Sequence, residues 1–109
     1  MKSRTIATFA VLALTLALPA FAAAPDGAAL YKSKCAGCHG ADGSGQTSMG
    51  KAMKIRDLRS DGVQKQTDLE LMKVISGGKG KMPAFGKQLS TDDVKALIVH
   101  IRTLKGTPK

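Results

Sequence analysis

The chain has 109 residues, with 17 lysines and arginines against 8 aspartates and glutamates, so its formal net charge at pH 7 is +9. This length allows one domain with a modest apolar core, and only 4% of the residues are aromatic. The predicted core is therefore underfilled, and a large apolar cofactor would fill it.

The first 22 residues have the parts of a secretory signal peptide. Lys2 and Arg4 form a positive start, residues 6–18 are apolar, and a small-x-small cleavage pattern ends at Ala22. We expect cleavage after Ala22 and a periplasmic domain formed by residues 23–109. A membrane anchor is the alternative, and it is less favoured because the apolar run is too short and lacks a charged stop.

The remaining chain reads as short helices joined by long glycine-rich loops, without the alternation that is typical of strands. Residues 26–34 are a helix candidate that opens on an aspartate cap, and one turn of helix is expected near residues 48–54. The predicted fold class is therefore all-α.

Two capping sequences mark longer helices in the second half. Thr67 and Glu70 form a capping box before a helix that ends at Gly77 and Gly78, and Ser90 opens the last helix in the same way. The apolar residues that should cover most of the first of these helices and bury it are Leu69, Leu71, Met72, Val74 and Ile75. Those on one stripe of the last helix are Val94, Leu97, Ile98, Ile101 and Leu104.

The only two cysteines, Cys35 and Cys38, belong to the motif Cys-x-x-Cys-His, which His39 completes. A disulfide at this spacing closes a very small loop, a thioredoxin-type pair wants strands, and a zinc site finds only His100 as a fourth ligand. The spacing instead favours covalent attachment of one haem c through both thiols, with His39 as an iron ligand. A redox or metal pair is the minor alternative.

The second iron ligand decides between electron transfer and chemistry on small molecules. The candidates are Met49, Met53, Met72, Met82 and His100. Met82 is favoured because it follows a glycine-rich loop and precedes Pro83, which restricts it to an extended conformation. Met49, Met53, His100 and an open position are the alternatives.

These motifs, in this order over residues 23–109, resemble the class I c-type cytochromes, small secreted bacterial electron carriers. The stretches that carry the resemblance are LYKSKCAGCHGADGSG, GKGKMPAFG and STDDVKALIVHIRTLK. The resemblance implies the cytochrome c fold around one covalently bound haem, with Cys35 and Cys38 as attachment sites. It also implies His39 and Met82 as the two axial ligands, and crossed first and last helices.

Gly27 and Tyr31 match the face of the family's first helix that meets the last one near Leu97. His100 stands where the family usually has an aromatic residue, and we expect it to cover part of the same contact rather than bind iron. Many relatives have a proline whose carbonyl holds the proximal histidine. No proline lies between His39 and Pro83, so another backbone carbonyl should orient the Nδ1–H of His39.

The expected function is one-electron transfer between periplasmic or membrane-bound redox partners, without enzymatic bond chemistry. The residues expected to line the haem slot are Leu58, Met72, Ile75 and Phe85. An enzyme or sensor that binds a diatomic or peroxide, and a haem subunit docked in a larger complex, are the alternatives.

Charge indicates the partners. Without Lys2 and Arg4 the net charge is +7, and one loop carries four of the cations while three more surround Met82. These two clusters are Lys51, Lys54, Arg56 and Arg59, and Lys79, Lys81 and Lys87. We expect a monomer that docks on acidic redox proteins, with at most weak contact to anionic membranes and none to nucleic acid. A generally basic, soluble surface is the alternative.

Overall fold

The structure is a computed structural model that describes residues 7–19 and 24–107. Residues 7–19 have no regular secondary structure, and their side chains are exposed. Lys2, Arg4 and the predicted cleavage point after Ala22 lie outside the described residues. Within the described ranges, no helix has both the length and the apolar character that a membrane crossing requires.

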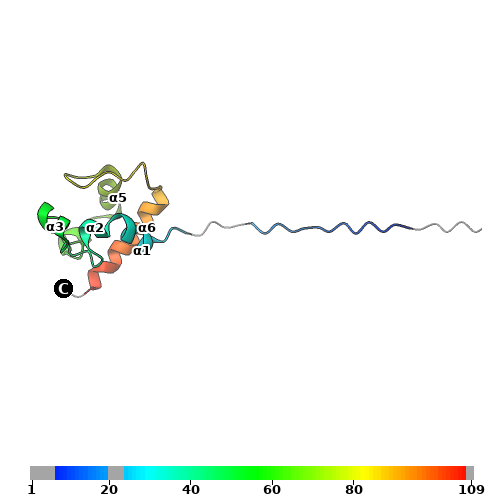
Figure 1. Ribbon diagram of the computed structural model, residues 1–109, viewed down its shortest axis with the longest axis horizontal. Coiled ribbons are helices and arrows are strands. Elements are labelled where there is room, and N and C mark those ends of the chain that lie inside the picture. The colour runs from blue at the N-terminus through cyan, green and yellow to red at the C-terminus, as the bar shows by residue number, and fades with distance from the viewer. Residues whose placement is uncertain (1–6, 20–23, 108–109) are drawn as a thin grey trace, which may run out of the picture.

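Short helices and long loops make up the described domain (Figure 1). In chain order they are α1 (Gly27–Lys34), α2 (Ala36–His39), α3 (Ser48–Met53), α4 (Asp61–Gln64), α5 (Asp68–Gly77), α6 (Thr91–Thr103) and the 3₁₀ helix η1 (Leu104–Gly106). Among residues 24–107 the extended pairing is limited to one isolated bridge, between Lys79 and Met82. The predicted all-α class is confirmed.

The helix caps form as the sequence predicts. The Asp26 carboxylate accepts a hydrogen bond from the Ala29 N–H at 3.1 Å, which begins α1. Both capping boxes are complete, so Thr67 begins α5 and Ser90 begins α6. Gly78 ends α5 at a φ of 75°, a conformation that glycine adopts without strain. These caps satisfy backbone groups that the helices themselves leave unpaired.

Two short helices were not predicted. α2 holds the Cys-x-x-Cys-His motif, and α4 begins at Ser60, whose hydroxyl accepts from the Val63 N–H at 3.4 Å. Each spans four residues, too few for a hydrophobic period to show in the sequence. The expected turn near residues 48–54 is present as α3.

α1 and α6 cross at the centre of the domain, with α5 packed beside α6 (Figure 1). Gly27 makes the close approach possible, because a Cβ there would collide with the carbonyl oxygen of Ala96. Tyr31 and Leu97 fill the crossing and are 2% and 0% exposed. The predicted meeting of Gly27 and Tyr31 with the last helix near Leu97 is confirmed, and the whole predicted stripe of α6 is buried.

The burial of α5 is narrower than the sequence predicts. Leu71 and Ile75 are buried, Met72 and Val74 are half-buried, and Leu69 is 61% exposed. The prediction was wrong for Leu69 because α5 packs on one side only, against α6 and the cavity described below.

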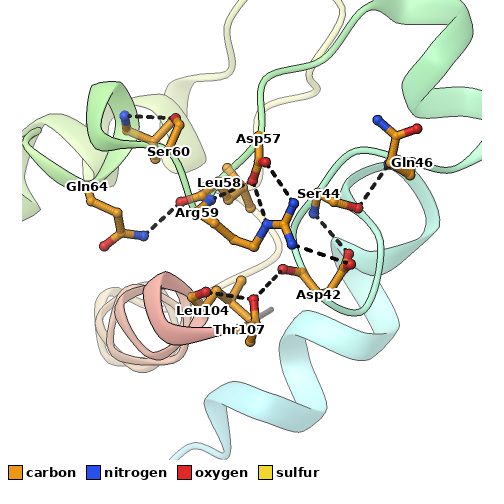
Figure 2. Close-up of polar contacts among 11 residues, drawn as sticks. Asp42, Ser44, Gln46, Asp57, Leu58, Arg59, Ser60, Gln64, Leu104 and Thr107 are labelled. Atoms are coloured by element: carbon orange, nitrogen blue, oxygen red, sulfur yellow. Dashed lines mark hydrogen bonds and ion pairs between the residues drawn. The ribbon is translucent and has the colours of Figure 1, made fainter. Parts of the chain in front are cut away.

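Arg59 joins two loops from within the structure (Figure 2). Its side chain is only 8% exposed, and its guanidinium forms ion pairs with Asp57 at 2.9 Å and with Asp42 at 3.9 Å. The Asp42 carboxylate also accepts from the Ser44 N–H at 3.0 Å. Arg59 therefore belongs to a structural ion-pair network, whereas Lys51, Lys54 and Arg56, the cations predicted to cluster with it in one loop, are exposed.

The side-chain amide of Gln64 ties the same region to α6. It donates to the Leu58 carbonyl at 2.7 Å, as Figure 2 shows, and to the Ile101 carbonyl at 3.1 Å. Arg102 of α6 donates in return to the Gln64 carbonyl at 2.8 Å. These bonds hold Leu58 in place at the wall of the cavity.

Candidate functional site

One cavity of about 220 Å³ lies between the loops and the helices of the core. Apolar side chains form most of its wall: Tyr31, Cys35, Ile55, Leu58, Val63, Leu71, Val74, Ile75, Met82 and Ile101. The other lining residues are His39, Lys54, Arg56, Gln66 and Lys79. The charged side chains among the described lining residues are therefore lysine and arginine.

His39, the last residue of α2, is held by its backbone. Its N–H donates to the Cys35 carbonyl at 2.9 Å, and its own carbonyl accepts from the Gly45 N–H at 2.7 Å. Burial lowers the pKa of the imidazole, because the charged form loses its hydration. His39 therefore presents a neutral ring to the cavity, the form that can bind a metal.

The Nδ1 atom of His39 is buried and has no hydrogen-bond partner among the described residues. The expectation that a nearby backbone carbonyl would orient it was wrong for this structure. The neighbouring carbonyls are engaged elsewhere: that of Cys38 accepts from the Thr47 hydroxyl at 2.7 Å, and that of Gly40 accepts from the Tyr31 hydroxyl at 2.7 Å. Buried polar groups without a partner are rare and costly.

Cys35 is the N-cap of α2 and Cys38 lies within this helix, and both are free, half-buried thiols. Burial, and then the neighbouring Cys38, raise the pKa of the Cys35 thiol to about 11. Redox-active cysteine pairs have lowered pKa values, so this environment disfavours the thioredoxin-type alternative. In residues 7–19 and 24–107, no three histidine, cysteine or acidic side chains are placed to hold a metal ion together.

The loop that carries Met82 folds back onto the end of α5. Lys79 and Met82 exchange two backbone hydrogen bonds, of 3.2 and 3.0 Å, and the Phe85 N–H donates to the Ile75 carbonyl at 3.0 Å. A Cβ at Gly78 would lie 2.7 Å from the Met82 carbonyl oxygen, so glycine is needed there for the loop to close. This loop brings Met82 to the cavity that His39 lines, although the two residues are far apart in the sequence.

The other candidates for the second iron ligand lie elsewhere. Met49 is 48% exposed on α3, and Met53 and Met72 do not line the cavity. The ring of His100 packs against that of Tyr31, with centroids 4.8 Å apart, as expected for a packing role. Of the five candidates, Met82 is the one that shares the cavity with His39.

Sequence reasoning placed the cavity wall only in part. Leu58 and Ile75 line it as expected, whereas Met72 and Phe85 pack on the core outside it. Leu71 and Val74 also line the cavity, and the spacing of apolar residues in α5 could have predicted them. Five other lining residues were not predicted, and the sequence carries no signal for them, because they reach the cavity from loops and from the short α4. These residues are Lys54, Ile55, Arg56, Val63 and Gln66.

Residues 22–101 match the family model described as cytochrome C oxidase, cbb3-type, subunit III. Subunit FixP of the cbb3-type cytochrome c oxidase of Azorhizobium caulinodans is 36% identical over 84 residues. That match covers 77% of this chain but only 28% of FixP.

Shorter relatives are covered more fully. Cytochrome c6 of Leptolyngbya boryana is 34% identical over 75 residues, which are 69% of this chain and 85% of that protein. Cytochrome c-553 of Nitratidesulfovibrio vulgaris is 37% identical over 92 residues, with 76% and 80% covered. Among solved structures, the KustC0563 c-type cytochrome matches with a TM-score of 0.68 and 33% identity, over 73% of this chain and 98% of that one.

Proposed function

Because this chain belongs to the class I c-type cytochromes and has their fold, we propose that it is a monohaem carrier of single electrons. It would bind one haem c in the cavity between His39 and Met82 and shuttle electrons between periplasmic or membrane-bound redox proteins. The protein would catalyse no bond chemistry of its own.

The observation that carries this proposal is the shared cavity of Cys35, His39 and Met82. Its wall is mostly apolar, which suits a flat apolar cofactor. The half-buried His39 imidazole, whose pKa is lowered, and the Met82 thioether are the nitrogen and sulfur ligands that haem iron accepts in electron-transfer cytochromes. The residues present therefore fit the cofactor.

Each residue has a role in this proposal. Cys35 and Cys38 would hold the cofactor covalently, and His39 and Met82 would be the two ligands of its iron. When bound, the haem supplies a one-electron couple, because its iron alternates between ferric and ferrous states. The soft thioether of Met82 and the apolar wall both favour the ferrous state, which raises the reduction potential.

Expression with a c-type haem maturation system tests the proposal, through spectra of the oxidised and reduced protein. We expect covalent haem and six-coordinate iron in both states at neutral pH. Met82→Ala should open one coordination position and allow the ferrous protein to bind carbon monoxide, whereas Met49→Ala at an exposed position should not. Carbon monoxide binding by the unmodified protein at neutral pH would contradict the carrier proposal and support the sensor or enzyme.

Folding should depend on the cofactor, because the haem would supply much of the core and its binding free energy would become folding free energy. We expect the double substitution Cys35→Ala and Cys38→Ala to give an unfolded or degraded chain, measured by circular dichroism and by yield. A stable, helical, haem-free double variant would contradict this.

The partners would be acidic redox proteins that dock near the Met82 loop. Lys79, Lys81 and Lys87 are exposed there. Charge of one sign around the docking site speeds association and loses effect as salt screens it. Electron transfer to an acidic partner should therefore slow with ionic strength, and substitution of the three lysines by glutamine should flatten that dependence. Electron-transfer rates that change neither with ionic strength nor with these substitutions would contradict a docking role and indicate that the lysines serve solubility alone.

The location would be the periplasm, with residues 1–22 as a signal peptide and residues 23–109 as the cytochrome domain. Cell fractionation and N-terminal sequencing of the mature protein test this, since a start at residue 23 is expected. The similarity to FixP favours a second candidate, a haem subunit of a larger membrane complex. Recovery of the protein in a stable complex from membranes would support that candidate over the free carrier.

A further inference from the structure

Two exposed cations line the cavity from the segment between α3 and α4. Lys54 and Arg56 line the cavity together with Ile55, which lies between them. Neither cation forms an ion pair with an acidic side chain in the described part of the chain, whereas Arg59, three residues after Arg56, does.

The backbone conformation of Lys54 is unusual. Its φ of 52° makes it the one non-glycine residue with positive φ in the described ranges, and it ends α3 as a left-handed C-cap. Glycine adopts this conformation without strain, and five glycines of this chain have positive φ elsewhere. A strained residue at a ligand cavity points to a use for its side chain.

The position of the Arg56 guanidinium depends on a neighbouring glycine. It lies over Gly62 at the start of α4, where a Cβ would come within 2.9 Å of its Nη2 atom. The missing side chain at Gly62 therefore leaves room for the guanidinium beside the cavity.

We infer that Lys54 and Arg56 receive the two carboxylates of the haem and raise its reduction potential, an inference that rests on the proposed function. The cavity combines an apolar wall with these unpaired cations, which suits a flat apolar ligand that carries carboxylates on one side. Lys79, the third cation of the wall, is bound through its backbone to Met82 and belongs to the ligand loop. Cations beside the carboxylates disfavour the additional positive charge of the ferric state.

The test is the midpoint potential of the haem-loaded protein, measured by spectroelectrochemistry at one pH and one ionic strength. At a fixed applied potential, Lys54→Gln and Arg56→Gln should each raise the ferric-to-ferrous ratio about threefold to tenfold, where tenfold is 59 mV for one electron. Arg56→Lys keeps the charge and should restore most of the potential. Lys51→Gln, on the exposed face of α3, is the matched control and should change the ratio less than about twofold.

Lys54→Gly separates a role in binding from a role in the backbone. A residue that only caps α3 would be improved by glycine, with no change in potential. The inference expects glycine to lower the potential as glutamine does, while the melting temperature of the glycine variant is no lower than that of the glutamine variant. Potentials of the Lys54 and Arg56 variants that equal that of the control, or a fall with Lys79→Gln alone, would overturn the assignment. Failure of the unmodified chain to attach haem would instead overturn the proposed function.

Discussion

Replacement of Tyr31 by phenylalanine removes one hydroxyl from the crossing of α1 and α6 and leaves the ring in place. The side chain is 2% exposed, and its hydroxyl donates to the Gly40 carbonyl at 2.7 Å, directly after His39. A buried carbonyl left without any donor costs about 1–3 kcal/mol. The Gly40 carbonyl, however, also accepts from the Gly43 N–H at 3.1 Å, so it keeps one partner.

The expected loss for Tyr31→Phe is therefore that of one hydrogen bond, about 0.5–1.5 kcal/mol of the free energy of unfolding. For a domain of this size, 1 kcal/mol lowers the melting temperature by about 4–8 °C. Ser33→Ala is the matched control on the same helix, because it removes an exposed hydroxyl that donates to the Leu30 carbonyl at 3.2 Å. It should change the free energy of unfolding by less than about 0.5 kcal/mol.

The pH dependence of Tyr31→Phe provides a second check. Burial, and then the neighbouring Cys35 and Asp42, raise the pKa of the Tyr31 hydroxyl far above its usual value of 10.0. A raised folded pKa contributes stability that is complete below the unfolded value and is lost as the pH rises beyond it. Denaturant unfolding of the haem-loaded protein should therefore give the same difference between the two proteins at pH 6 and at pH 8. No difference at either pH, or a loss above about 2.5 kcal/mol, would refute the reasoning.

The remaining predictions concern packing and charge. Gly27→Ala should lower the free energy of unfolding by about 1–3 kcal/mol, because its Cβ collides with the backbone of α6, whereas Gly37→Ala, with open space around it, should be neutral or stabilising in the same denaturant titration. Arg59→Met should lower the melting temperature more than the exposed control Lys65→Met, because it leaves two loops without their shared cation; equal effects would contradict this. Hydrogen bonds from Ser44, and then the Arg59 guanidinium, lower the pKa of the Asp42 carboxyl. The stability that this carboxylate contributes is therefore present above the unfolded pKa of 3.8 and is lost as the pH falls below it. Asp42→Asn should therefore reduce the difference between denaturation midpoints measured at pH 7 and pH 3, and an unchanged difference would exclude this role.

The helix starts could be read from the sequence because each cap is a contact between residues three positions apart. Asp26, Thr67 and Ser90 find their partners within one turn, whatever the rest of the chain does. The motif of Cys35, Cys38 and His39 is equally local, so the sequence alone could propose haem attachment there before the fold was known. The stripe of α6 was predicted correctly because a helix that is buried along one face carries the helical period in its sequence.

What lies next to these elements depends on contacts between distant segments. Only the fold brings Met82 to the cavity of His39, and only the packing of α5 leaves Leu69 in solvent while Leu71 lines the wall. The helical spacing of apolar residues shows that a residue can face the core, but it does not show which of several neighbouring apolar residues is buried.

The cations illustrate the same limit. Arg56 and Arg59 are three positions apart in one loop, and the sequence alone assigns both to the same cationic cluster. The tertiary structure places Arg56 at the cavity wall and pairs Arg59 with Asp57 and Asp42 inside a network. The sequence by itself determined the longer helices, their caps and the Cys-x-x-Cys-His motif, because those depend on near neighbours. The burial of His39, the place of Lys54 at the cavity and the ion pairs of Arg59 were decided by the tertiary structure, because burial and charge pairing depend on segments that only folding brings together.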